Sequence, residues 1–348
     1  MVKTTQLSSK DIKGVIAYMP TPVRTDIVID RHAKDVLNLD EAARAADVLI
    51  KDGATGICLN GTFGELPSLT FEEIVDLTRA VVESVNDRVP VFAGATTLNT
   101  RDTIKRVRAF REVGAHGLNM GRPMMSAMSD IAIVQYYRDI AEEFPDMAIF
   151  LYDDMQAFKR PITTEVYAEL AKIPQIVACK YRTMLVLGQP IANNYANDMR
   201  AVDGRIKLLT HEYDWWISNK LFDMDAIWSS SISMAPGPIM AMQDAILAKD
   251  YAKAEVIRAD MQWASEGLFP KTGIDDWHVS KIPAMKTRIH TSGYIKCGPA
   301  LPPYHVAPEE RFEAGRAAGM RDREMHKKYP HKTMRQAESA MREVSTAA

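Results

Sequence analysis

Short apolar runs alternate along the chain with longer segments in which apolar residues recur every three or four positions. Runs of the first kind are typical of buried β-strands, and segments of the second kind are typical of amphipathic helices. Their regular alternation predicts a parallel sheet whose strands are connected by crossover helices. We count eight apolar runs, at residues 14–22, 56–61, 89–95, 117–123, 148–153, 176–181, 206–212 and 226–233.

Segments with helical periodicity lie between these runs and are long enough to connect parallel strands, at residues 68–85, 100–113, 130–144 and 163–172. Eight strand-helix units favour an α/β fold of the closed (β/α)8 TIM-barrel type over a doubly wound sheet, which usually has fewer strands. The GxGxxG phosphate turn that typically follows the first strand of a doubly wound sheet is also missing here.

The remaining sequence predicts extensions at both ends of the barrel. We expect an N-terminal extension at 1–13, the barrel at 14–237, a C-terminal helical region at 238–320 and a polar tail at 321–348. The tail is either a docked helix or partly disordered, and its pattern alone does not decide between the two.

Composition narrows the class of protein. Hydrophobic residues make up 47% of the 348 residues and charged residues 25%, which is ordinary for a globular protein with a large core. The formal net charge of -2 argues against a general nucleic-acid binder. The three cysteines have no metal-type spacing, so we expect reduced thiols and a cytoplasmic protein. No apolar signal core or run of roughly 20 apolar residues occurs, so we expect no association with a membrane.

Lys180 is the sharpest candidate for chemistry because it ends an apolar strand, where the active sites of such barrels form. Desolvation disfavours the ammonium form of a buried lysine. The sequence therefore predicts an amine of lowered pKa that acts as a nucleophile. The alternative is a lysine that pairs with a carboxylate or extends to the barrel rim.

Tyr152 and the turn GTFGE, residues 61–65, follow two further strands and are expected at the same end of the barrel. A phenol beside the amine can carry protons, although an aromatic residue that only plugs the rim is equally consistent. Gly61 lets backbone amides face a ligand and Thr62 adds a hydroxyl, so the turn is a candidate carboxylate site. Such turns are also common for structural reasons, and Glu65 is equally suited to fixing the turn or capping a helix.

Two acidic or metal-type pairs near strand ends carry weaker signals. His211 and Glu212 end the seventh run and resemble part of a divalent-metal site, but no further ligand recurs at a suitable spacing. Asp153 and Asp154 follow the fifth run, where carboxylates commonly cap helices or bind arginine. We therefore expect no metal.

Taken together, GTFGE after the second strand, Tyr152 after the fifth and Lys180 after the sixth resemble the dihydrodipicolinate synthase and N-acetylneuraminate lyase family of class I aldolases. Within this family the chain is most similar to the hydratase-aldolases of aromatic hydrocarbon breakdown, which act on trans-arylidene pyruvates. The likeness covers residues 11–319 and is carried by the passages MPTP, TTLNTRDTI, GRPM, EVYAEL, IPQIVA and GPALPPY.

The resemblance implies a homotetramer of barrels that acts on a small molecule without a metal or organic cofactor. It implies that Lys180 forms an imine with the 2-oxo group of the substrate and that Tyr152 relays protons. Thr62 and neighbouring amides are implied to hold the carboxylate of the keto acid, and Trp228 is implied to flank the aryl ring.

The sequence departs from the wider family at positions that bear on the substrate. Phe63 replaces a common second hydroxyl, and Asp153 and Asp154 stand where Asn and Pro are usual, so synthase activity on aspartate semialdehyde is not expected. Lys296 and Arg182 are two extra cations suited to a second anionic group on the aryl ring, although a surface position is the alternative for both.

We therefore predict a hydratase-aldolase of polycyclic aromatic hydrocarbon degradation. Its expected substrate is trans-2'-carboxybenzalpyruvate or a close aryl analogue, cleaved to an aromatic aldehyde and pyruvate. One alternative is a pyruvate-dependent class I lyase of sugar acids or other hydroxy-oxo acids, which would need more hydrogen-bonding side chains than Phe63 and Trp228 offer. Another is a non-catalytic barrel that binds a 2-oxo acid with Lys180 as a counter-charge.

Overall fold

The barrel expected from the sequence is present in the computed structural model, which describes residues 7–154, 157–181, 195–271 and 273–330. Eight parallel strands pair in chain order, and the first pairs with the last to close the barrel. They are β1 Gly14–Tyr18, β2 Ala54–Cys58, β3 Val91–Gly94, β4 Gly117–Met120, β5 Ala148–Tyr152, β6 Ile176–Lys180, β7 Lys207–His211 and β8 Ala226–Ser229. The predicted fold class is confirmed, and only β2 begins before its predicted run.

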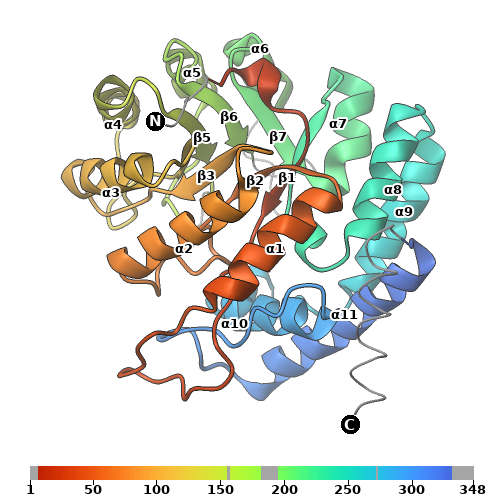
Figure 1. The fold of residues 1–348 in the computed structure, drawn as a ribbon. Coiled ribbons are helices and arrows are strands. Elements are labelled where there is room, and N and C mark those ends of the chain that lie inside the picture. The colour runs from red at the N-terminus through yellow and green to blue at the C-terminus, as the bar shows by residue number, and fades with distance from the viewer. Residues whose placement is uncertain (1–6, 155–156, 182–194, 272, 331–348) are drawn as a thin grey trace.

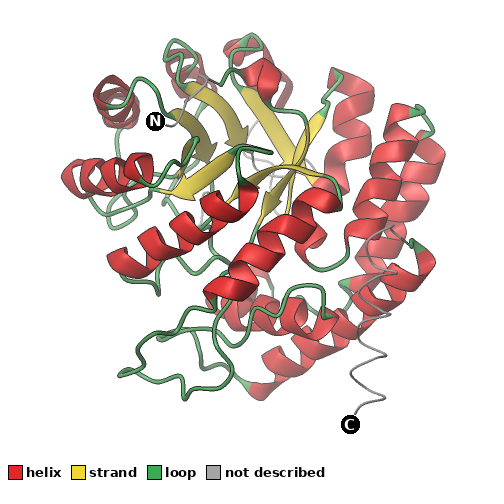
Figure 2. Ribbon diagram, in the orientation of Figure 1, coloured by secondary structure: helices red, strands yellow, loops and turns green. Residues whose placement is uncertain are grey.

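Helices surround the closed sheet, as Figures 1 and 2 show. Those of the barrel are α1 Leu39–Lys51, α2 Phe71–Val85, α3 Thr100–Glu112, α4 Asp130–Glu143, α5 Thr164–Leu170, α6 Tyr195–Val202, α7 Trp215–Phe222 and α8 Pro236–Leu247. Three more follow the barrel, namely α9 Tyr251–Ala264, α10 Ile274–Ser292 and α11 Glu309–Lys328.

Capping side chains set where the helices begin. The hydroxyl of Thr70 accepts a hydrogen bond from the amide of Glu73, whose carboxylate accepts one from the amide of Thr70 at 2.8 Å. This reciprocal pair satisfies amides that have no partner within the helix. Helix α2 therefore begins at Phe71, three residues later than its periodicity predicts.

Apolar side chains fill the barrel interior below the ends of the strands. Phe92 of β3 and Phe150 of β5 meet edge to face, with ring centroids 5.3 Å apart. Ile16, Val177 and Leu209 are buried in the same cluster. A filled interior is a packed core and not a pore, so the open end for chemistry is the one at the carboxyl ends of the strands.

The helices that follow the barrel are tied to one another by a buried ion pair. Arg288 of α10 donates two hydrogen bonds of 2.8 Å to Asp322 of α11. Helix α11 continues to Lys328, so the expected end of the helical region at residue 320 falls inside a helix. Within the described residues, no helix is both long enough and apolar enough to cross a bilayer.

Candidate active site

The amine of Lys180 lies in a chamber of aromatic rings at the carboxyl end of β6. Its Nζ is 3.8 Å from the centroid of the Trp228 ring, 4.4 Å from that of Tyr152 and 5.6 Å from that of Tyr18. Lys180 and Tyr152 are register partners on β6 and β5, so both side chains leave the sheet at the same level. The structure thus brings residues from four strands around one amine.

Burial lowers the pKa of Lys180 to about 8. The positive charge of Lys281 on α10 acts in the same direction, whereas the negative charges of Asp154 and Glu212 oppose the shift. A lysine with a pKa of 8 is uncharged in roughly one molecule in ten at pH 7, against far fewer for an exposed lysine. The chamber therefore supplies a usable nucleophile near neutral pH.

A hydrogen bond of 2.8 Å joins the phenol of Tyr152 to the hydroxyl of Thr62. Burial, and after it the negative charge of Asp154, raises the pKa of Tyr152 well above its ordinary value. The phenol therefore keeps its proton at neutral pH and needs a strongly basic partner to lose it. Its position beside the Lys180 amine suits it to pass protons to and from atoms of a bound substrate.

The turn at 61–65 has the close packing that a glycine allows. A Cβ on Gly61 would lie 3.2 Å from the Tyr18 ring, so a larger residue would press on the chamber. The amide of Gly64 donates to the carbonyl of Gly61 at 3.1 Å. Within the described residues the amide of Phe63 has no acceptor, and its ring packs half-buried on the apolar core. The turn thus offers Thr62 and one adjacent amide to an anion.

Glu65 anchors this turn and does not cap a helix. Its buried carboxylate lies 2.7 Å from Nζ of Lys286 on α10 and accepts a 2.7 Å hydrogen bond from the amide of Leu301. Lys286 also donates to the carbonyl of Thr21 in the loop after β1. No local pattern in the sequence identifies Lys286 as the partner, because it lies 221 positions away in a helix that only the tertiary fold brings to this turn.

Asp153 binds an arginine, which is one of the two roles that its position after the fifth apolar run suggests. Its carboxylate accepts two hydrogen bonds of 3.2 Å from the guanidinium of Arg122 and one of 3.0 Å from the phenol of Tyr167. All three groups are buried. The carboxylate therefore binds an arginine and fixes the strand end next to Tyr152, whereas Asp154 exerts the electrostatic effect on Lys180.

Trp228 at the end of β8 is held in place from two sides. Its indole nitrogen donates to the carbonyl of Tyr181 at 3.1 Å. The ring of His211 meets it at a centroid distance of 4.4 Å and an interplanar angle of 75°. The indole is therefore a fixed wall of the amine chamber.

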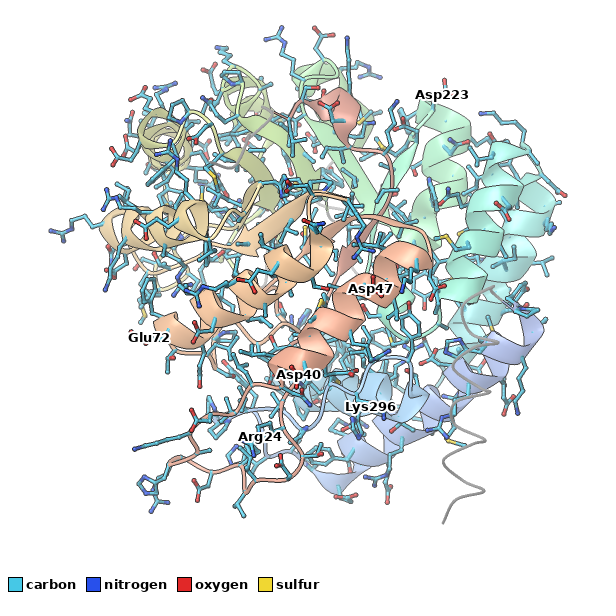
Figure 3. The ribbon with its side chains drawn as sticks, viewed as in Figure 1. Arg24, Asp40, Asp47, Glu72, Asp223 and Lys296 are labelled. Carbon is cyan, nitrogen blue, oxygen red and sulfur yellow. The ribbon has the colours of Figure 1, made fainter. Side chains whose placement is uncertain are left out.

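The two extra cations, Lys296 and Arg182, are not among the described residues that line the amine chamber. The Lys296 side chain is exposed, and its amide donates to Glu41 of α1 at 2.7 Å, near Asp40 in Figure 3. Lys296 therefore has the surface position expected as the alternative to a role at the aryl ring. Arg182 lies outside the described residues. Lys281, which sequence reasoning missed because it lies in a helix and not at a strand end, is the cation that acts on Lys180.

No metal centre is formed by the described residues. No group of three or more His, Cys, Asp or Glu side chains there has an arrangement that could hold an ion. The pair His211 and Glu212 has no third ligand of these types among the same described residues.

Known proteins resemble the chain over nearly its whole length. The sequence profile of the dihydrodipicolinate synthetase family matches residues 11–310. The chain is 37% identical to the trans-2'-carboxybenzalpyruvate hydratase-aldolase of Nocardioides sp. (strain KP7), covering 93% of this chain and 96% of that protein. It is 36% identical to the trans-O-hydroxybenzylidenepyruvate hydratase-aldolase of Pseudomonas putida, covering 94% and 98%.

A solved structure described as PhdJ bound to substrate intermediate has the same architecture. It superimposes with a TM-score of 0.89 at 37% sequence identity, over 93% of this chain and 99% of that one. The profile, the relatives and the fold agree with one another and with the lysine chamber. The chain therefore belongs to the dihydrodipicolinate synthetase family and is a lyase of the class I aldolase type.

Proposed function

We propose that this protein is a hydratase-aldolase that cleaves a trans-arylidene pyruvate to an aromatic aldehyde and pyruvate through an imine on Lys180. The observation that carries the proposal is the buried amine of Lys180, with a pKa lowered to about 8, beside the hydrogen-bonded pair of Tyr152 and Thr62. The hydratase-aldolases of Nocardioides sp. (strain KP7) and Pseudomonas putida support the same reaction class for this chain.

Imine formation is the first step. The uncharged amine of Lys180 attacks the 2-oxo carbon, water leaves, and the resulting imine carries a proton. The carboxylate of the keto acid next to that carbon then binds the hydroxyl of Thr62 and the amide of Phe63, which has no acceptor within the described residues. The ring of Trp228 then faces the cationic imine, an arrangement that favours positive charge.

Hydration and cleavage share the same electron sink. The protonated imine withdraws electrons from the conjugated double bond, so water adds a hydroxyl group to the carbon beside the aryl ring and a proton to its neighbour. The phenol of Tyr152 gives its proton to the hydroxyl group that leaves as water when the protonated imine forms, so its oxygen is then a base. It takes the proton of the new hydroxyl group while the bond between the third and fourth carbons breaks, and the electron pair passes into the enamine. Protonation of the enamine and hydrolysis release pyruvate and free Lys180. These steps require no metal or organic cofactor.

The finer substrate assignment is an aryl group with an ortho carboxylate, which gives 2-formylbenzoate, within the degradation of polycyclic aromatic hydrocarbons. The Nocardioides relative is named for a carboxylated substrate. The positive charge of Lys281 reaches the chamber and suits a substrate with a second anion, whereas the exposed Lys296 does not contribute. The aromatic walls favour an aryl group over a sugar acid.

Two measurements test the reaction. Pyruvate with borohydride should fix a pyruvate-sized mass on the peptide that contains Lys180, and Lys180→Ala should abolish both the adduct and turnover. Loss of ultraviolet absorbance across a panel of arylidene pyruvates and sugar acids should rank the aryl substrates first. An active alanine variant, or saturable pyruvate binding without a reducible adduct, would overturn the proposal.

We further propose that the enzyme is a cytoplasmic homotetramer, as the family resemblance implies. Light scattering on the purified protein measures the oligomeric state directly. A monomer at the working concentration of the enzyme assay would contradict it.

A further inference from the structure

Glu212 is a buried carboxylate that the reaction sequence above does not use. It follows β7, and its side chain is 0% exposed. One carboxylate oxygen accepts a hydrogen bond of 3.1 Å from the amide of Ser231, and the other lies 3.2 Å from Nε2 of His211. Burying a carboxylate is costly unless it is paired, so this group needs an explanation.

His211 links this carboxylate to the wall of the amine chamber. Its Nδ1 accepts from the amide of Tyr213 at 3.5 Å, which leaves the proton of the neutral ring on Nε2. This nitrogen lies 3.2 Å from the Glu212 carboxylate oxygen that accepts no hydrogen bond within the described residues, so a small rotation of either side chain would join them. The ring stacks on Tyr213 at 5.0 Å and meets the indole of Trp228 at 4.4 Å. His211 and Trp228 are also register partners on β7 and β8. One indole ring therefore separates the pair from the Lys180 amine.

We propose that Glu212 and His211 act as a positioning pair, in which Glu212 holds His211 against Trp228 and supplies the buried negative charge that balances the cationic imine on Lys180. The inference rests on the proposed imine chemistry and adds to it the source of the counter-charge. It assigns no contact between Glu212 and the substrate.

The charges around the pair agree with this role. Burial raises the pKa of Glu212 to about 7, opposed by the hydrogen bonds from Ser231 and by the charge of Arg288. Burial, and after it the charge of Lys180, lowers the pKa of His211 to about 3, so the imidazole stays neutral. Glu212 is therefore ionised above about pH 7, where it raises the pKa of Lys180.

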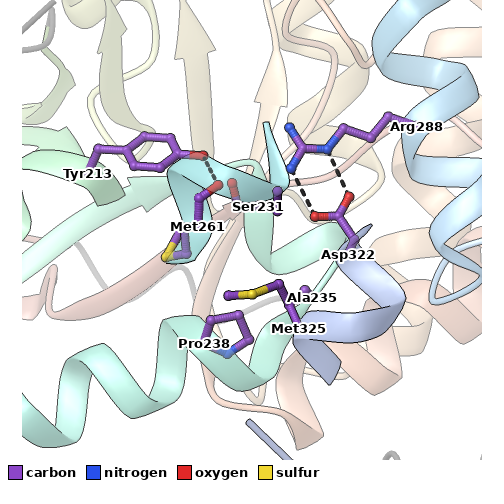
Figure 4. Close-up of a pocket in the computed structure, with 9 residues that line it drawn as sticks. Tyr213, Ser231, Ala235, Pro238, Met261, Arg288, Asp322 and Met325 are labelled. Atoms are coloured by element: carbon purple, nitrogen blue, oxygen red, sulfur yellow. Dashed lines mark hydrogen bonds and ion pairs between the residues drawn. The ribbon is translucent and has the colours of Figure 1, made fainter. Parts of the chain in front are cut away.

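Further charged groups act on Lys180 and on Glu212. Asp154 acts on Lys180 in the same direction as Glu212, and Lys281 acts against them. Arg288 faces Glu212 from α10 but is already paired with Asp322. A cavity of about 10 Å³, lined among others by Tyr213, Ser231, Arg288 and Asp322, is at the lower limit for one water molecule (Figure 4).

The test compares the pH profiles of wild type and Glu212→Gln, a variant that keeps the shape of the side chain but not its charge. Reductive trapping of pyruvate on Lys180 and steady-state turnover are measured from pH 5.5 to pH 9.5. Below about pH 6 the two proteins should agree, because Glu212 is protonated there. Above pH 7 the variant should lose on the order of tenfold in turnover. Its profiles of trapping and of turnover should both move about half a pH unit or more to lower pH.

Two further variants separate the possible outcomes. Glu41→Gln removes a buried carboxylate of α1 that is not among the charges acting on Lys180, and should leave the profiles of trapping and turnover in place. His211→Phe keeps a ring against Trp228 but removes the imidazole nitrogen that lies 3.2 Å from Glu212, so the pH at which its profile departs from that of Glu212→Gln should rise. If Glu212→Gln does not fold, His211→Phe is compared with wild type instead, and its turnover should fall below that of wild type near pH 7 and approach it again at higher pH.

The inference and the proposed function fail in different ways. A wild-type protein that never traps pyruvate would remove the imine itself. A wild type that traps pyruvate, together with a Glu212→Gln profile that is unchanged or reduced equally at every pH, would overturn only the role of the pair.

Discussion

The phenol oxygen of Tyr152 and the hydroxyl oxygen of Thr62 lie 2.8 Å apart, although 90 positions separate the two residues in the chain. Tyr152 ends β5 and Thr62 follows β2, so the contact crosses the mouth of the barrel. It joins the group that moves protons to the turn that is proposed to hold the substrate carboxylate. Several measurable properties depend on this contact and on the charges around it.

Removal of the Thr62 hydroxyl should slow turnover more than it weakens binding. We expect Thr62→Val to reduce kcat on the order of 100-fold, because the phenol of Tyr152 loses the partner that orients it. Thr62→Ser keeps the hydroxyl and should recover most of the activity. Steady-state kinetics and substrate titration give the two quantities. Equal activity of the serine and valine variants would show that the hydrogen bond does not matter.

The pH dependence of imine formation should follow the lowered pKa of Lys180, about 8 against an ordinary 10.5. Only the uncharged amine attacks, so the trapping rate should rise about tenfold per pH unit below pH 8 and level off above it. Rapid reductive trapping followed by mass spectrometry measures the profile. A rate that still climbs steeply beyond pH 10 would contradict a depressed pKa.

Lys281 should influence the choice between charged and uncharged aryl substrates. We expect Lys281→Met to lower the ratio of kcat/KM for a carboxylated over an unsubstituted arylidene pyruvate by about tenfold, because one positive charge that acts on the Lys180 amine is lost. Lys296→Met is the matched control, since that side chain is exposed beside α1, and should leave the ratio unchanged. The opposite result for the two variants would restore Lys296 as the specificity residue.

The ion pair between Glu65 and Lys286 should matter for stability. Both side chains are at most 1% exposed, so Lys286→Met leaves a buried carboxylate without its partner. We expect a loss of about 3–5 kcal/mol in the free energy of unfolding, measured with urea. Adding Glu65→Gln should recover part of that loss, because the stranded charge is then gone. A double variant less stable than Lys286→Met would argue against an unpaired charge as the cause.

The sequence by itself determined the fold class and the chemical centre of this protein. Apolar runs and helical periodicity repeat locally, so they could be read without knowing any long-range contact. Lys180 was found because a lysine in an apolar strand conflicts with its surroundings, and Tyr152 and Thr62 were found because they end or follow strands of the same barrel. These signals lie within a few residues of the positions they identify.

Only the tertiary structure decided which charges act on that centre. Lys281 and Lys286 lie in a helix beyond the barrel, and their partners are far away in sequence, so no local pattern could assign them. The same holds for Lys296, whose exposed position beside α1 depends on how the last loop packs. Electrostatic effects depend on distance and burial in three dimensions, whereas strand and helix patterns depend on neighbours along the chain.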